Sequence, residues 1–145
     1  MKIINEMRLE VESRSVNESF ARVTVSAFAA QLDPTVEELS DIKTAVSEAV
    51  TNCIVHAYPN VMGKIYIYAA ILTDNTVRVR VRDRGCGIAN VAQAMEPLFT
   101  TLAGERAGLG FAVMESFMDS VKVRSRVGRG TAVTLEKKVS GKTDG

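Results

Sequence analysis

The spacing of apolar residues predicts two helices in the first part of the chain. Residues 17–32 carry apolar side chains at helical spacing, and Pro34 ends this stretch because proline cannot continue the backbone hydrogen bonds. A longer helix is expected from Thr35 to about Ala57, beginning with a capping box in which Glu38 follows Thr35 by three residues. The apolar stripe of the first helix consists of Phe20, Val23, Ala27 and Ala30. The stripe of the second helix, which we expect to face the core, consists of Val36, Leu39, Ile42, Val46, Val50, Cys53 and Ile54.

Alternating apolar and polar residues predict five strands. In the stretch 76–82, three valines alternate with three arginines, which indicates one buried face and one face in water. The turn-forming run Thr73-Asp74-Asn75 predicts an antiparallel hairpin with the strand before it. The strands are expected at residues 3–11, 64–72, 76–82, 119–127 and 131–137. The order of elements predicts an α+β fold, a two-layer sandwich with the helices on one face of a mainly antiparallel sheet.

The segment between the third and fourth strands is less regular. We expect one helical turn at 90–94, a mobile loop over 95–107 that lacks clear periodicity, and a helix that Gly108-Leu109-Gly110 opens and that runs to about Met118. Two glycines at the start of a helix leave backbone N–H groups free to face a phosphate, and the helix dipole favours negative charge there.

Length and composition limit the class of protein. With 145 residues, 46% of them hydrophobic, the chain fits a single domain spanning residues 1–145, with a loose polar tail from about residue 138. The formal net charge of +1 gives no electrostatic case for nucleic acid as the main ligand, and no apolar run is long enough to cross a bilayer. Cys53 and Cys86 lack metal or redox spacing, and the charged first residues lack the apolar stretch of a signal peptide. We therefore expect the protein to act in a reducing cytoplasm.

Polar residues of the second helix form the first candidate site. Glu48, Thr51, Asn52 and His56 are three or four residues apart and therefore share a helix face. A carboxylate and an amide on one face suit a general base and a ligand of Mg²⁺, which usually takes one or two protein oxygens plus phosphates and water. A solvated helix face explains the same spacing, and His56 also suits a hydrogen bond at the helix end.

Two turn-rich segments are further candidates. In the run Asp83-Arg84-Gly85-Cys86-Gly87, a carboxylate at a strand end could accept a hydrogen bond from a ligand amino group, although an ordinary strand-exit turn has the same composition. Gly104, Arg106 and the Gly108–Gly110 pair could hold phosphates. Neither a GK[ST] phosphate loop nor a Rossmann glycine pattern is present.

A stripe of alternating arginines consists of Arg78, Arg80, Arg82 and Arg84. A solvated strand face is the favoured explanation of this pattern, and a surface for a partner is the alternative. A groove for nucleic acid would require aromatic residues for base stacking on the same face, and we expect none there.

Taken in order, these motifs resemble those of the GHKL ATPase/kinase superfamily. The run 48–57 (EAVTNCIVHA) is similar to its N-box, the run 83–87 (DRGCG) to its first glycine box, Gly108-Leu109-Gly110 to its second, and Gly130-Thr131 to its closing box. Further stretches at 17–24, 31–35, 97–101 and 114–119 resemble the anti-sigma serine kinases of spore-forming bacteria. The resemblance implies the ATP-binding fold that is also called the Bergerat fold.

The resemblance also implies roles for individual residues. Glu48 would be the general base and Asn52 a ligand of Mg²⁺. The nucleotide, ATP or ADP, would be bound by Asn52, Asp83, Gly85, Gly87, Thr100, Thr101, Arg106, Gly108, Gly110 and Thr131, with Asp83 accepting a hydrogen bond from the adenine amino group. Glu18, Arg22 and Thr51 would contact protein partners.

By this resemblance, the chain is an ATP-dependent protein-serine kinase and anti-sigma factor. It would hold a sporulation sigma factor when ATP is bound, phosphorylate a serine of an anti-anti-sigma protein, form a homodimer, and act in the cytoplasm of the forespore without contacting nucleic acid or membrane. A stress-response anti-sigma kinase would share every nucleotide motif. The same motifs also fit a module that binds ATP and sigma factor without phosphotransfer, and the catalytic domain of a sensor histidine kinase.

Overall fold

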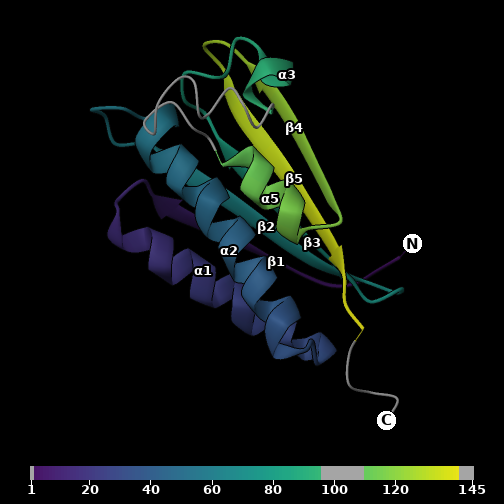
Figure 1. Cartoon of the computed structure of the whole chain (residues 1–145). Helices are drawn as coiled ribbons and strands as arrows, with labels where there is room; N and C mark the ends of the chain where they lie inside the picture. Colours follow the sequence, from purple (N-terminus) through teal and green to yellow (C-terminus); the bar gives the residue numbers. More distant parts are fainter. Residues whose placement is uncertain (1, 96–109, 141–145) are drawn as a thin grey trace.

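The computed structural model describes residues 2–95 and 110–140 and contains one antiparallel sheet in the order β1-β2-β3-β5-β4 (Figure 1). The strands are β1 (Ile3–Glu12), β2 (Lys64–Leu72), β3 (Thr76–Asp83), β4 (Ser120–Arg126) and β5 (Gly130–Lys138). The helices are α1 (Val16–Ala29), α2 (Val36–Asn52), α3 (Val91–Ala94) and α5 (Phe111–Phe117), with a 3-10 turn at Ala30–Leu32 and a π turn at Cys53–Ala57. The predicted α+β fold is confirmed.

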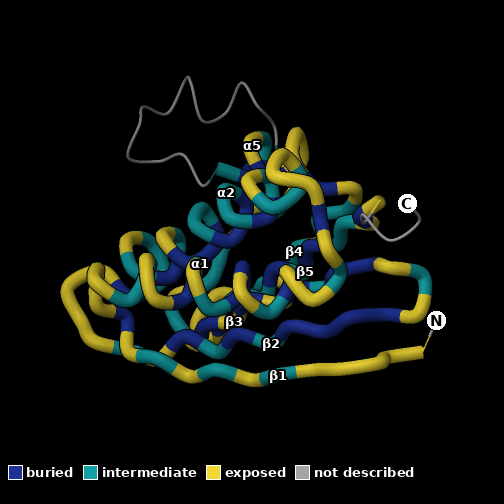
Figure 2. The backbone as a smooth tube through the Cα atoms, turned by 90° about the horizontal axis from the view of Figure 1, so that it is seen from below, coloured by how far each residue is buried: buried dark blue, intermediate teal, exposed yellow. Residues whose placement is uncertain are grey.

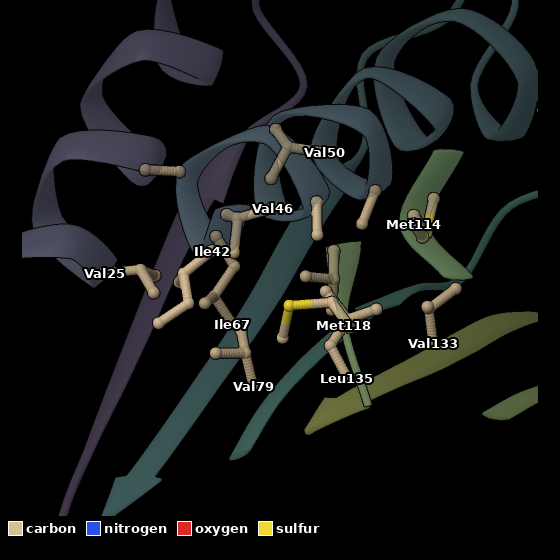
Figure 3. Close-up of a cluster of buried hydrophobic side chains, with 14 of the residues drawn as sticks. Val25, Ile42, Val46, Val50, Ile67, Val79, Met114, Met118, Val133 and Leu135 are labelled. Carbon is tan, nitrogen blue, oxygen red and sulfur yellow. The ribbon is translucent and has the colours of Figure 1, made fainter. Parts of the chain in front are cut away.

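The helices α1, α2 and α5 cover one face of the sheet and leave the other face open (Figure 2). The register explains this arrangement, because Val79 pairs with Ala69 on one side and with Leu135 on the other, so that buried residues of neighbouring strands point to the same face. The core lies between this face and the helices (Figure 3), and its labelled members are Val25, Ile42, Val46, Val50, Ile67, Val79, Met114, Met118, Val133 and Leu135.

Helix α2 begins as predicted and ends differently. Thr35 Oγ1 accepts a hydrogen bond from the Glu38 amide at 3.1 Å, and Glu38 Oε1 accepts one from the Thr35 amide at 2.9 Å, which completes the capping box. The α-helical pattern stops at Asn52, and the last predicted turn is a π turn. Val36 was expected in the core but is 88% exposed, because the first helical residue lies at the outer end of the stripe.

Helix α1 packs through small residues. Ala21, Val25 and Ala29 are buried, and small side chains let α1 lie close to α2. The predicted apolar stripe lies on the outer flank instead, where Phe20 is 53% and Val23 55% exposed. Two stripes with the same helical spacing are present on this helix, and the larger side chains are on the exposed one.

The end of the described chain is anchored rather than loose. Lys138 belongs to β5, Val139 is buried, and the Ser140 amide and hydroxyl both donate to Glu38 Oε2, at 2.8 and 3.0 Å. The prediction of a loose tail from residue 138 is therefore wrong for residues 138–140, and residues 141–145 lie outside the described part of the chain.

Candidate functional site

A cavity opens where the end of α2 meets the end of β3 and the start of β5. It brings together four of the residues predicted to bind nucleotide, namely Asn52, Asp83, Gly87 and Thr131. The remaining lining is mostly apolar and consists of Ala49, Cys53, His56, Ala57, Val81, Ile88, Phe111 and Val133. A largely apolar cleft with a few polar groups is the usual form of a small-molecule site.

Asp83 is the polar group at the base of this cavity. It is 6% exposed, and its Oδ1 accepts hydrogen bonds from the Gly85 amide at 2.9 Å and the Thr131 amide at 3.1 Å. The Cys53 thiol donates to its Oδ2 at 3.6 Å. Burial raises the pKa of Asp83, and the three hydrogen bonds oppose that rise. These contacts hold the carboxyl group in one orientation.

The glycine turn after β3 packs tightly against two other segments. Gly87 has a φ of +79°, and a side chain there would meet the Arg126 carbonyl. The Cys86 amide donates to the Ala57 carbonyl at 3.1 Å, and the Cys86 thiol donates to the His56 carbonyl at 3.2 Å. The π turn and the glycine turn therefore support each other at the mouth of the cavity.

Glu48 lies on α2, one helical turn before Asn52, and faces the start of α5. Gly110 has a φ of +68°, and a Cβ at this position would collide with the Glu48 carboxylate. Burial raises the pKa of Glu48. The structure thus places a half-buried carboxylate with increased basicity beside the last glycine of the second glycine box.

Asn52 provides an amide oxygen at the edge of the cavity. Within residues 2–95 and 110–140, no group of three or more His, Cys, Asp and Glu residues could hold a metal ion by itself. A single amide oxygen would fit Mg²⁺ if phosphates bind beside it as predicted, because Mg²⁺ takes few protein ligands when phosphates and water supply the rest.

The three predicted partner-binding residues lie near one another on α1 and α2. Arg22 Nε donates to Glu18 Oε2 at 2.8 Å. Burial alone would raise the pKa of Glu18. Hydrogen bonds from Arg22 and Ser47 outweigh this effect, so the pKa lies below its ordinary value. Because Ser47 lies one turn before the exposed Thr51 on α2, the surface of α1 continues to the edge of the candidate site.

Four predicted site residues lie outside the described part of the chain: Thr100, Thr101, Arg106 and Gly108. The predicted loop over residues 95–107 falls in the same gap, apart from Met95.

Sequence reasoning missed two residues that support the site. Tyr58 is 8% exposed, and its hydroxyl donates to the Lys64 carbonyl and accepts from the Arg84 amide, both at 2.7 Å. Ser125 Oγ lies 2.7 Å from Thr131 Oγ1 and accepts from the Ile88 amide at 2.7 Å. No local pattern in the sequence indicates either residue, because Tyr58 and Ser125 contact segments that are far apart in the chain.

Comparison with known proteins assigns the class. Residues 9–137 match the model of the histidine kinase-like ATPase domain. The chain belongs to this family of nucleotide-binding, kinase-type ATPase domains. Within the family, it belongs to the anti-sigma F factors.

Two relatives show how similar the chain is to anti-sigma F factors in sequence. The anti-sigma F factor of Caldanaerobacter subterraneus subsp. tengcongensis is 59% identical over 138 residues, which cover 94% of this chain and 96% of the relative. The anti-sigma F factor of Geobacillus thermodenitrificans is 55% identical over 137 residues, which cover 94% of each chain.

Solved structures share the fold at low sequence identity. A structure of the RsbU and RsbW domains of a Mycobacterium tuberculosis protein matches with a TM-score of 0.69 and 21% identity, covering 93% of this chain and 32% of that one. The catalytic domain of the histidine kinase ThkA matches with a TM-score of 0.57 and 17% identity, covering 96% and 97%. Among the described residues, no helix has both the length and the apolar character needed to span a membrane.

Proposed function

We propose that this chain binds ATP with Mg²⁺ in the cavity beside Asp83 and transfers the γ-phosphoryl group to a serine of an anti-anti-sigma protein. We propose further that, with ATP bound, it holds a sporulation sigma factor inactive. The observation that supports this proposal most directly is the half-buried Glu48 carboxylate, which lies against Gly110 and one helical turn from Asn52.

The proposed reaction needs one base and well-placed phosphate ligands. Glu48 would accept the proton of the serine hydroxyl while the serine oxygen forms a bond to the γ-phosphorus, and the bond to the bridging oxygen of ADP breaks. The raised pKa of Glu48 supports this role, because a more basic carboxylate accepts a proton more readily. Asn52 would hold Mg²⁺, which when bound neutralises charge on the phosphates.

The proposed nucleotide contacts divide between the two ends of the cavity. Asp83 would accept a hydrogen bond from the adenine amino group, with Gly85, Gly87 and Thr131 beside the ring. The phosphates would be held by Thr100, Thr101, Arg106, Gly108 and Gly110. The hydrogen bonds that fix Asp83 support the first assignment, since an oriented acceptor binds a planar base selectively.

The partners are proposed from the names of the relatives and from the surface of α1. The relatives are anti-sigma F factors, which supports a sigma factor as one partner. That this is a sporulation sigma factor, and that the protein acts in the forespore cytoplasm, is proposed from the resemblance of the sequence motifs. Glu18, Arg22 and Thr51 would contact both the sigma factor and the anti-anti-sigma protein, so that one surface serves competing partners. A homodimer is proposed from the resemblance of the sequence motifs alone.

The base is tested by replacing Glu48 with glutamine. Glu48→Gln is expected to reduce serine phosphorylation at least a hundredfold, because only the proton acceptor is lost, while ATP affinity changes less than threefold. Transfer from labelled ATP to the anti-anti-sigma protein measures the first quantity, and calorimetry the second. Glu37→Gln, on the exposed first turn of the same helix, is the control and keeps full activity.

The same assay separates the competing functions. A wild-type rate in Glu48→Gln would show that Glu48 is not the base. Absence of transfer by the unmodified protein, with ATP and sigma factor still bound, would favour a binding module without phosphotransfer. Capture of a stress-response sigma factor in place of a sporulation one would favour the stress-response type.

A further inference from the structure

The open face of the sheet carries a row of basic side chains on each side of β5. Alternate residues of a strand point to the same face, and the valines of β3 are buried, so the arginines between them point away from the helices. The pairing of β4 with β5 brings the basic residues of β4 to the same open face. The two rows are Arg78, Arg80 and Arg82 on β3, and Lys122, Arg124 and Arg126 on β4.

Small side chains of β5 form the floor between these rows. Ala132 pairs with both Arg82 and Arg124, and Thr134 pairs with both Arg80 and Lys122. The rows are two strand spacings apart, about 10 Å. Two depressions of about 530 and 550 Å³ lie here and share Arg82, Arg124 and Ala132, so the hollow is continuous. We call it the β5 trough: the two basic rows with Ala132 and Thr134 between them.

Most of the positive charge in the β5 trough is not neutralised. Arg78 pairs with Glu136 at 2.6 Å. The other five basic side chains are exposed and form no ion pair with the residues that the structure describes. Since the whole chain has a formal net charge of only +1, the charges are segregated, and the β5 trough is strongly positive.

Two tyrosines of β2 lie on this open face, which corrects the expectation that no aromatic residue accompanies the arginines. The guanidinium carbons of Arg8 and Arg80 lie 4.9 and 5.1 Å from the centre of the Tyr68 ring. Those of Arg82 and Arg84 lie 5.0 and 4.9 Å from the centre of the Tyr66 ring. The rings thus hold one wall of the β5 trough in place and lie on the far side of β3 from its floor.

We propose that the β5 trough binds an acidic segment of a protein partner in an extended conformation. Side chains on one side of an extended chain repeat about every 6.8 Å, which is also the spacing of arginines along each wall. Carboxylates of successive residues would therefore face the two walls in turn. Guanidinium groups bind carboxylates through two parallel hydrogen bonds, which favours arginine over lysine at such a site.

Other polyanions fit the β5 trough less well. Single-stranded nucleic acid gains much of its affinity from base stacking. Tyr66 and Tyr68 lie outside the trough and already contact the guanidinium groups of Arg82 and Arg80, so they do not offer bases a stacking surface within it. A duplex, whose major groove alone is about 12 Å wide, does not enter a trough of about 10 Å. A second copy of this chain also fits poorly, because its binding here would bring two positively charged troughs together.

The test uses a fluorescein-labelled decaglutamate peptide and fluorescence anisotropy without nucleotide. The unmodified protein is expected to bind it, less tightly as salt increases. Arg82→Ala with Arg124→Ala should weaken binding at least tenfold. Lys2→Ala with Arg14→Ala removes the same charge at exposed positions outside the trough and should change affinity less than twofold. Arg82→Lys with Arg124→Lys keeps the charge and should weaken binding about threefold, because the paired hydrogen bonds are lost.

Three results would overturn the proposal. They are no binding of decaglutamate by the unmodified protein, an equal loss of affinity in the Lys2 and Arg14 control, and tighter binding of a ten-residue oligothymidine than of decaglutamate. Thermal unfolding of each variant verifies that the sheet is intact. Phosphotransfer is measured separately, so this test and that of the proposed function fail independently.

Discussion

At the scale of single residues, the surroundings of Glu48 determine how it can act. Helix α2 holds the carboxylate beside Gly110, where burial raises its pKa. A carboxyl group with a raised pKa is a better proton acceptor. Its surroundings therefore favour the chemistry that the proposed reaction requires.

This raised pKa predicts the pH dependence of phosphotransfer. As the pH falls through the pKa of Glu48, the carboxylate gains a proton and can no longer act as a base. The rate is therefore expected to fall on the acid side with a midpoint above the ordinary pKa of glutamate. Single-turnover measurements across this range test it. A midpoint at or below the ordinary value would contradict the assignment.

Gly110 provides a second residue-scale prediction. Gly110→Ala and Gly128→Ala both place alanine at a positive φ, +68° and +80°, and both should lose about 1–2 kcal/mol of unfolding free energy. Only the Cβ at position 110 would meet Glu48, and nothing lies within 4 Å of one at position 128. Phosphotransfer should therefore fall at least tenfold in Gly110→Ala and stay within twofold in Gly128→Ala.

Denaturant unfolding and transfer assays on both glycine variants measure these quantities. Equal activity of the two variants would show that the close approach of Gly110 to Glu48 has no part in the reaction.

The sequence predicted some of these residues and could not predict others. Asp83 could be found because it follows an alternating strand and precedes two glycines. The thiol of Cys53 and the hydroxyl of Tyr58 could not, because their contacts with Asp83 and Arg84 join segments far apart in the chain. Local patterns identify the motif, and tertiary packing supplies the groups that fix its orientation.

At the scale of elements, α2 is stabilised at its first turn and modified at its last. The capping box satisfies two backbone amides at the start, and Glu38 also receives hydrogen bonds from Ser140. The π turn at the end brings the Ala57 carbonyl to the Cys86 amide. The capping box has a four-residue signature in the sequence, whereas the π turn depends on a contact with a distant segment and has none.

The capping box predicts the effect of a single hydroxyl. Thr35→Ala is expected to lower the unfolding free energy by about 1 kcal/mol, because the Glu38 amide loses its acceptor. Thr44→Ala removes a hydroxyl that donates to the Ser40 carbonyl within the same helix and should change stability by less than about 0.5 kcal/mol. Chemical denaturation compares the two, and a larger loss in Thr44→Ala would contradict the assignment.

At the scale of the whole molecule, the packing of α1 on α2 places the proposed partner surface beside the nucleotide cavity. Glu18 and Arg22 lie on α1, and Thr51 lies on α2 between that surface and Asn52. Changes at the proposed phosphate end of the cavity would therefore be close to any partner bound at α1.

This arrangement predicts that partner and nucleotide affinities can be separated. Arg22→Ala is expected to weaken binding of the sigma factor about tenfold, because charged residues often dominate such contacts, while ATP affinity stays within twofold. The ion pair with Glu18 is partly exposed, so the fold should lose less than about 1 kcal/mol. Calorimetry with each ligand tests this, and Arg14→Ala, exposed near the start of α1, is the control.

The strand order is the part of the whole molecule that the sequence left open. Element types and most boundaries follow from periodicity, but nothing local shows that β5 lies between β3 and β4. Because β5 lies between β3 and β4, one basic row lies on each side of it. The neighbouring β2 brings Tyr66 and Tyr68 to the same face, which no single strand reveals.

The unequal burial of the two cysteines gives the protein a built-in labelling position. Cys53 is 2% exposed, and burial raises the pKa of its thiol, whereas Cys86 is exposed in the glycine turn. A maleimide dye would therefore attach at one place without any engineered change, beside the mouth of the cavity. Fluorescence from that single dye could follow ligand exchange in real time.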